Sequence, residues 1–147
     1  MQRRQFLAAA AAAPALLAGC TTAPGYTAPR GGVDGLLSGV QKYMGTNPDQ
    51  TAASLGAMFG LAKNNLSPAD FAALNTSLPG IGDLVTKGAS LGGFSPASLT
   101  SMQSVYSAVS KLNVSPAQIG AMGNYVTGAL GGAGATSSAN MLSSLWR

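Results

Sequence analysis

Apolar positions recur at helical spacing along most of the 147-residue chain. In the first such stretch, residues 33–44, they fall at i, i+3, i+4, i+7 and i+11, that is at Val33, Leu36, Leu37, Val40 and Met44. This spacing puts the side chains on one face of a helix. No stretch alternates apolar and polar residues as a half-buried strand does. The pattern therefore predicts an all-α protein, folded as a small helical bundle.

The starts of four further helices are marked by a capping side chain followed by proline. The prolines are Pro48, Pro68, Pro96 and Pro116, and each follows Asn or Ser. Such a side chain accepts a hydrogen bond from the first turn, and proline is favoured at the first helical position. We predict helices over residues 48–63, 68–78, 96–112 and 116–130, the third being the longest, and a short helix over residues 81–87.

Two glycine-rich stretches interrupt this pattern. We predict a loop over residues 88–94 and a flexible linker over residues 131–140. After the linker, four apolar residues form a short C-terminal helix that is expected to dock back on the domain: Met141, Leu142, Leu145 and Trp146. The chain thus divides into a signal peptide (1–19), a lipidated tether (20–32), a helical domain (33–130) and the linker with its apolar helix (131–147).

The prolines also indicate an internal repeat. An offset of 48 residues places Pro48 on Pro96 and Pro68 on Pro116, and it aligns residues 63–69 with residues 111–117. Two similar helical hairpins packed against each other would explain this offset. Chance recurrence of the Ser-Pro helix start is the alternative.

Residues 1–20 have the parts of a secretory signal: a basic start, an apolar run and small residues before a break. The run is shorter than the ~20 residues of a membrane span. Its end, Leu17-Ala18-Gly19-Cys20, resembles the lipobox of bacterial lipoproteins. The resemblance implies that the cysteine sulfur carries a diacylglyceryl group, with palmitate as a typical chain, and that cleavage occurs before Cys20. An ordinary signal with a chance cysteine is the alternative.

The start of the signal, Arg3-Arg4-Gln5-Phe6-Leu7, resembles the twin-arginine export motif. Gln2 and Ala8 depart from the residues usual at the flanks, so a general secretory signal that carries two arginines remains the alternative. Twin-arginine export would imply that the domain folds before it crosses the membrane.

These signals place the expected protein in the cell envelope, lipid-anchored and facing the periplasm. Thr21 follows the cysteine, and in enteric bacteria an Asp at that position retains lipoproteins in the inner membrane. Its absence favours the outer membrane.

Composition excludes several kinds of chemistry. The sequence has no His and no Glu, so Ser-His-Asp triads, imidazole acid–base catalysis and the usual zinc sites are ruled out. The formal net charge of +4 includes Arg3 and Arg4, and no basic cluster of the kind that binds nucleic acids remains without them. We expect no catalytic residue, no metal and no cofactor.

The remaining charges follow the predicted helix ends. Asp34, Asp49, Asp70 and Asp83 are expected in or beside first turns, and Lys42, Lys63, Lys87 and Lys111 in or near last turns. The helix dipole favours this arrangement by ~0.3–1 kcal/mol per exposed charge. A structural role therefore accounts for all eight side chains.

Several residues around one helix junction resemble an uncharacterised bacterial family, the VcgC/VcgE-like domain of unknown function. They are Leu61-Ala62-Lys63, Leu66-Ser67, Asp70-Phe71, Leu74 and Pro79-Gly80. The likeness extends over roughly residues 33–130. It implies a small helical envelope protein, and it supplies no catalytic residue.

Three functional hypotheses follow. The first is a structural or interaction module held at the membrane through Cys20, which binds an unidentified envelope protein through the apolar tail at residues 141–146. The second is a carrier of an apolar ligand or lipid, lined by Met58, Phe59, Met102, Tyr106 and Met122. The third is an enzyme, for which the sequence offers no tuned ionisable group.

Overall fold

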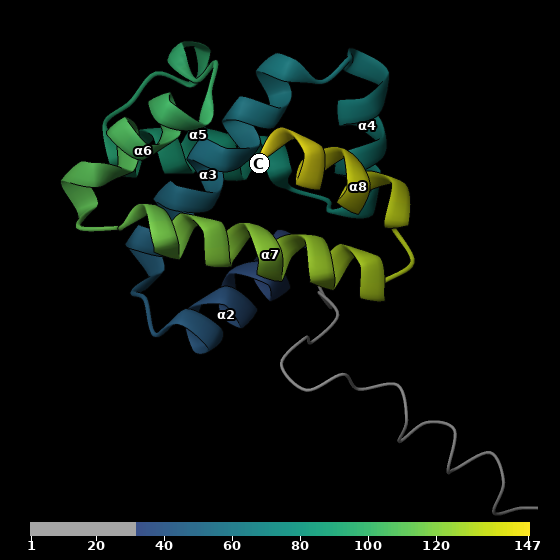
Figure 1. The fold of residues 1–147 in the computed structure, drawn as a ribbon, viewed down its shortest axis with the longest axis horizontal. Helices are drawn as coiled ribbons and strands as arrows, with labels where there is room; N and C mark the ends of the chain where they lie inside the picture. Colours follow the sequence, from purple (N-terminus) through teal and green to yellow (C-terminus); the bar gives the residue numbers. More distant parts are fainter. Residues whose placement is uncertain (1–31) are drawn as a thin grey trace, which may run out of the picture.

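The computed structural model describes residues 32–147, so Cys20, Arg3, Arg4 and the rest of the predicted signal lie outside the described residues. The described part folds into seven α-helices and two short 3-10 helices, without a strand, which confirms the predicted all-α bundle (Figure 1). The elements are α2 (Val33–Met44), α3 (Pro48–Asn65), α4 (Pro68–Ser77), α5 (Ile81–Gly92), η1 (Pro96–Ser98), α6 (Met102–Val109), η2 (Ser110–Leu112), α7 (Pro116–Gly132) and α8 (Thr136–Leu145).

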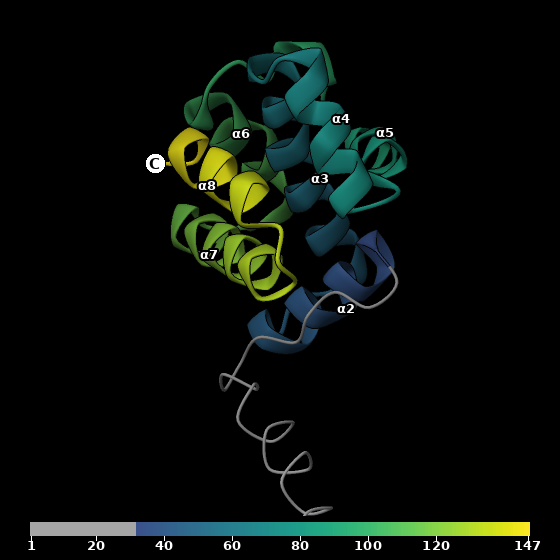
Figure 2. The same ribbon diagram turned by 90° about the vertical axis from the view of Figure 1, so that its right-hand side faces the viewer.

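Helix α3 forms the centre of the bundle. Every residue from Thr51 to Ala62 is buried, because α2, α5, α6, α7 and α8 surround the helix (Figures 1 and 2). A helix that is apolar or small on all sides is stable only when other elements cover it. Helix α2, on the outside, is amphipathic: it buries Val33, Leu36 and Val40 and leaves Asp34 exposed.

The predicted helix starts are confirmed at three of the four prolines. Asn47 accepts a hydrogen bond from the backbone N–H of Gln50 at 2.8 Å at the start of α3. Ser67 and Ser115 accept the corresponding bonds at the starts of α4 and α7, at 3.1 and 3.2 Å.

The loop predicted over residues 88–94 is wrong, because α5 continues to Gly92. Gly88 is buried against α3, where a Cβ atom would lie 2.7 Å from Gly56 Cα and 2.7 Å from the carbonyl oxygen of Ala52. The two helices therefore cross with their backbones in close contact. Tertiary packing offsets the low helix propensity of these glycines, and the helix ends at Gly93 with φ of 63°.

The helix predicted over residues 96–112 is interrupted. The longest helix within residues 32–147 is α3. Pro96 starts only a 3-10 turn, because the Asn64 side chain donates hydrogen bonds to the carbonyl oxygens of Pro96 (2.7 Å) and Leu99 (2.9 Å). Leu99 is buried, and Ser101 then caps α6 in a reciprocal pair with Ser104. Serine favours such caps over helix interiors.

The linker predicted over residues 131–140 is also wrong, since α7 continues to Gly132 and α8 begins at Thr136. Helix α8 packs against α7 and α4, and it buries Ala139 and Leu142 in the core. The expected docking of the C-terminal helix is confirmed: the Trp146 ring meets Phe59 edge to face at 5.8 Å. Residues 131–147 therefore belong to the bundle.

The two hairpins expected from the 48-residue offset are not alike. Their second helices share a serine cap followed by proline, at Ser67 and Ser115. However, α3 has 18 residues and is buried all round, whereas its counterpart α6 has 8 residues and buries only Val105 and Val109. The offset thus reflects a shared way of starting helices rather than a repeated hairpin.

Candidate functional site

Most of the charged side chains are exposed, and three of them, Asp34, Asp83 and Lys87, line one pocket of about 180 Å³ between α2 and α5. All four Asp residues stand in first turns, at Asp34, Asp49, Asp70 and Asp83, and only Asp70 is partly buried. Lys42 and Lys63 stand in last turns and Lys111 in η2, as predicted, but the extension of α5 leaves Lys87 in mid-helix. Within residues 32–147, no three potential metal ligands come together.

The residues predicted to line an apolar cavity do not form one together. Phe59 and Met122 are wholly buried core residues, and Tyr106 is partly buried against the core. Met58, which is also wholly buried, and Met102 line a pocket of about 140 Å³.

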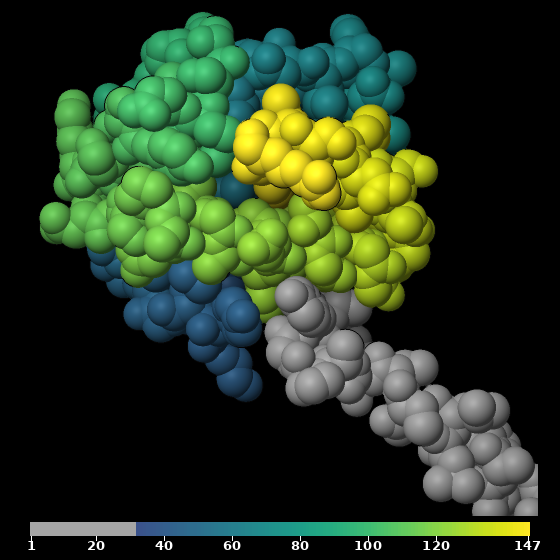
Figure 3. Space-filling view, in the orientation of Figure 1, coloured from purple at the N-terminus to yellow at the C-terminus, as the bar shows by residue number. Residues whose placement is uncertain are grey.

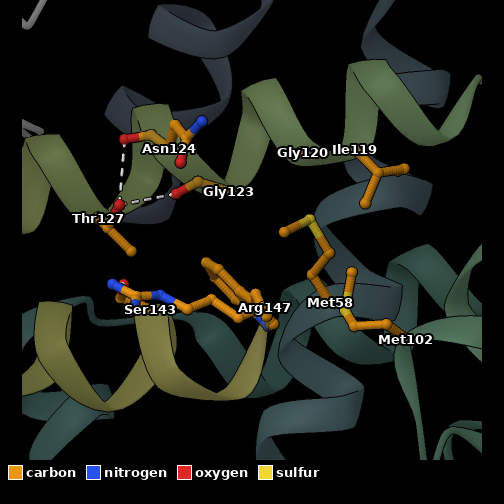
Figure 4. A pocket seen from close by; sticks show the side chains of 10 residues that line it. Met58, Met102, Ile119, Gly120, Gly123, Asn124, Thr127, Ser143 and Arg147 are labelled. Carbon is orange, nitrogen blue, oxygen red and sulfur yellow. Dashed lines mark hydrogen bonds between the residues drawn. The ribbon is translucent and has the colours of Figure 1, made fainter.

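This pocket, here called the Trp146 pocket, lies where α3, α6, α7 and the end of α8 meet (Figures 3 and 4). One face of α7 supplies half of its lining and the end of α8 supplies most of the rest. The lining residues are Met58, Met102, Ile119, Gly120, Gly123, Asn124, Thr127, Ser143, Trp146 and Arg147.

The two ends of the Trp146 pocket differ in polarity. Figure 4 shows Met58, Met102 and Ile119 at one end and the side chains of Asn124, Thr127 and Ser143 at the other. The Arg147 guanidinium reaches the polar end, where its Nη2 donates to Ser143 Oγ at 3.4 Å.

Trp146 forms part of the wall between the pocket and the core. A Cβ atom on Gly123 would lie 3.3 Å from its ring, so this glycine makes room for the indole on α7. The indole N–H is buried without a hydrogen-bond partner, which costs ~1–3 kcal/mol relative to a paired group. The edge-to-face contact with Phe59 recovers ~0.5–1.5 kcal/mol of this cost.

A second hollow, here called the α8 groove, runs between α8 and the start of α4. It is shallow, open to solvent and mostly apolar. Its lining residues are Leu66, Asp70, Asn140, Met141, Ser144 and Leu145. Leu142 points into the core, so α8 presents Met141 and Leu145 to the groove, where both are partly buried.

The sequence indicated one wall of the α8 groove, and for the Trp146 pocket it indicated Met58, Met102 and Trp146 but not the lining from α7. The apolar tail at residues 141–146 was expected to matter for binding, but its partners Leu66 and Asp70 are distant in sequence. The small residues Gly120 and Gly123 at helical spacing on α7 were a usable signal, since they leave space on the face that meets Trp146.

A family model matches most of the chain, including most residues of both hollows. The family model described as Protein of unknown function VcgC/VcgE (DUF2780) matches residues 5–145. The chain belongs to this family. The match is longer than the resemblance expected over residues 33–130, and it ends at the last residue of α8. Neither the search of curated proteins nor the search of solved structures produced a match.

Both hollows therefore lie in the part of this VcgC/VcgE-family protein that the family model covers, apart from Trp146 and Arg147. The lipobox residues Leu17, Ala18, Gly19 and Cys20 and the motif residues Arg3, Arg4, Phe6 and Leu7 lie outside the described residues. Within residues 32–147, no helix has the length and apolar character needed to cross a membrane.

Proposed function

We propose that this VcgC/VcgE-family protein is a lipid-anchored envelope lipoprotein whose helical domain binds another envelope protein. The observation that carries the anchor is the Leu17-Ala18-Gly19-Cys20 motif at the end of a short apolar run. The family match begins at residue 5, so the lipobox residues fall within the matched span, whereas Arg3 and Arg4 lie before it. Two or more acyl chains give stable anchoring, since each buried methylene contributes ~0.8 kcal/mol.

The proposed location is the periplasmic side of the outer membrane, reached by twin-arginine export. Arg3-Arg4-Gln5-Phe6-Leu7 supports the route, and Thr21 after the cysteine supports the outer membrane.

The α8 groove is the proposed binding surface of the module. Leu66, Met141 and Leu145 give it an apolar floor, and Asp70 supplies its one charged side chain. Charge complementarity therefore favours a short apolar segment of a partner protein that carries a lysine or arginine. Partly buried apolar side chains in such a groove are typical anchor points for a partner.

The anchor is tested by changing Cys20→Ser and labelling cells with a clickable palmitate analogue. We expect the label to disappear and the protein to leave the membrane fraction. Labelling equal to that of the unchanged chain would exclude lipidation at Cys20. Changing Arg3 and Arg4 together to Lys keeps the charge and tests the export route: normal processing of that variant would indicate general secretion.

The binding surface is tested by placing a photocrosslinking amino acid at Met141 in intact cells. The matched control places it at Ser90, an exposed position on α5 on the other side of α3 (Figure 2). We expect a discrete crosslinked protein from Met141 that is reduced by Asp70→Lys and absent from Ser90. Equal crosslinking from both positions, or from the Asp70→Lys variant, would contradict the proposed surface.

A further inference from the structure

We propose that the Trp146 pocket binds a small carboxylic acid with an apolar body, such as a short-chain or aromatic acid. This site is separate from the α8 groove and does not depend on the proposed partner. The inference rests on the size of the pocket, on the segregation of its lining and on the single cation at its polar end.

The volume sets the size of the ligand. A pocket of about 140 Å³ matches the ~150 Å³ of an engineered apolar cavity that binds benzene. A membrane-lipid acyl chain is several times larger, so the pocket does not fit a lipid. Six to eight carbon atoms fill a volume of this order.

The lining sets the chemistry of the ligand. Met58, Met102 and Ile119 offer an apolar end with polarisable sulfur atoms, which favour contacts with aromatic rings. Pockets of this kind use a few convergent polar groups to orient the ligand. Here these groups belong to α7 and to the end of α8.

The polar end selects an anion. The Arg147 guanidinium lies beside Ser143 at 3.4 Å, and a guanidinium binds a carboxylate through two parallel hydrogen bonds. The Asn124 amide can donate as well. The Thr127 hydroxyl donates its hydrogen bond to the carbonyl oxygens of Gly123 (3.0 Å) and Asn124 (3.1 Å), so it does not donate to the ligand. No carboxylate side chain lines the pocket to oppose an anion.

The single tryptophan of the chain makes binding directly measurable. Because Trp146 lines the pocket, a bound ligand changes its fluorescence. The full-length protein is titrated with benzoate, with hexanoate as the aliphatic acid and with benzyl alcohol as the uncharged analogue. We expect a saturable change with either acid, with Kd in the ~1 mM range or tighter, and at least ~10-fold weaker binding of benzyl alcohol.

Two variants alter the pocket, and each has a control variant that makes a similar change outside it. Arg147→Gln removes the cation and is expected to weaken benzoate binding ~10-fold or more, whereas Lys111→Gln removes an exposed charge elsewhere and leaves binding unchanged. Gly120→Leu fills the pocket, and Gly131→Leu places the same side chain on α7 outside it. A Cβ atom meets nothing within 4 Å at either glycine, so both variants are expected to fold.

The proposed site is supported if Arg147→Gln and Gly120→Leu weaken benzoate binding and the controls Lys111→Gln and Gly131→Leu do not. Absence of a saturable fluorescence change with both acids up to ~10 mM, ten times the expected Kd, would overturn the proposal. Equal binding by Gly120→Leu and the unchanged protein would overturn it as well.

Discussion

Two glycines set the distance between α3 and α5. Gly56 and Gly88 face each other, and a Cβ atom on either one would lie 2.7 Å from the Cα atom of the other. Glycine is required here for space rather than for backbone conformation, because both residues lie inside helices. Much of the contact surface of the central helix depends on this crossing.

The first prediction concerns this crossing. Gly88→Ala is expected to lower the free energy of unfolding by about 1–3 kcal/mol, because the added methyl group pushes two helix backbones apart. Gly82→Ala on the same helix is the control, since a Cβ there meets nothing within 4 Å. The control should be neutral or stabilising by up to ~1 kcal/mol. Urea denaturation measures both, and equal effects would contradict the close contact.

Residue patterns predicted helix starts well and helix interruptions poorly. The Asn47 and Ser115 caps are predicted by a local pattern, a capping side chain followed by proline, and both form as expected. In contrast, the break near Leu99 depends on Asn64, which lies on another helix. No local pattern could have revealed that contact.

Among the elements, α6 depends most clearly on its cap. It has only 8 residues, a length that is marginal for an isolated helix. Ser101 accepts a hydrogen bond from Ser104 N–H at 3.3 Å, and Ser104 Oγ accepts one from Ser101 N–H at 3.1 Å. This reciprocal pair fixes where the helix begins.

Removing that cap provides the second prediction. Ser101→Ala is expected to lower the free energy of unfolding by about 1 kcal/mol. Ser107→Ala removes an equivalent hydroxyl in the same helix, where it bonds only to the Gln103 carbonyl oxygen, and should change stability little. Thermal unfolding followed by circular dichroism distinguishes the two. A larger loss for Ser107→Ala would show that α6 does not depend on its cap.

The third prediction concerns α8. Leu142 is wholly buried, whereas Met141 next to it faces the α8 groove. Leu142→Ala is expected to cost about 2–5 kcal/mol, and Met141→Ala much less. If both substitutions left the unfolding midpoint unchanged, α8 would be a loosely attached tail rather than a part of the bundle.

At the scale of the whole molecule, helical class and the docking of the C-terminal helix were predictable, but the binding surfaces were not. Periodicity reports which face of a helix is apolar. It does not report which helices meet. The Trp146 pocket combines Met58, Met102, Asn124 and Arg147 from four elements, so only their arrangement in space reveals it. The loop and linker expectations failed for the same reason, since packing determined both segments.

The last prediction follows from the position of the carboxylates in the first turns of helices. Asp49→Asn and Asp83→Asn are expected to retain crosslinking from Met141 in cells, and to lower the free energy of unfolding by no more than ~1 kcal/mol. Both carboxylates are exposed in first turns. If a fully folded variant kept its crosslinked partner and still lost the cellular role of the protein, an enzymatic function would have to be reconsidered.

Because α3 lies at the centre of the bundle, the order in which the chain is synthesised decides when its core can form. Most of its partners, α5, α6, α7 and α8, follow it in sequence, and Phe59 meets Trp146 near the end of the chain. A ribosome synthesises this buried helix early, before most of the helices that cover it. The core therefore closes only after α8 and Trp146 have been synthesised. Until then α3 has to be shielded, and under the proposed twin-arginine route, in which the chain folds before export, this shielding is needed in the cytoplasm.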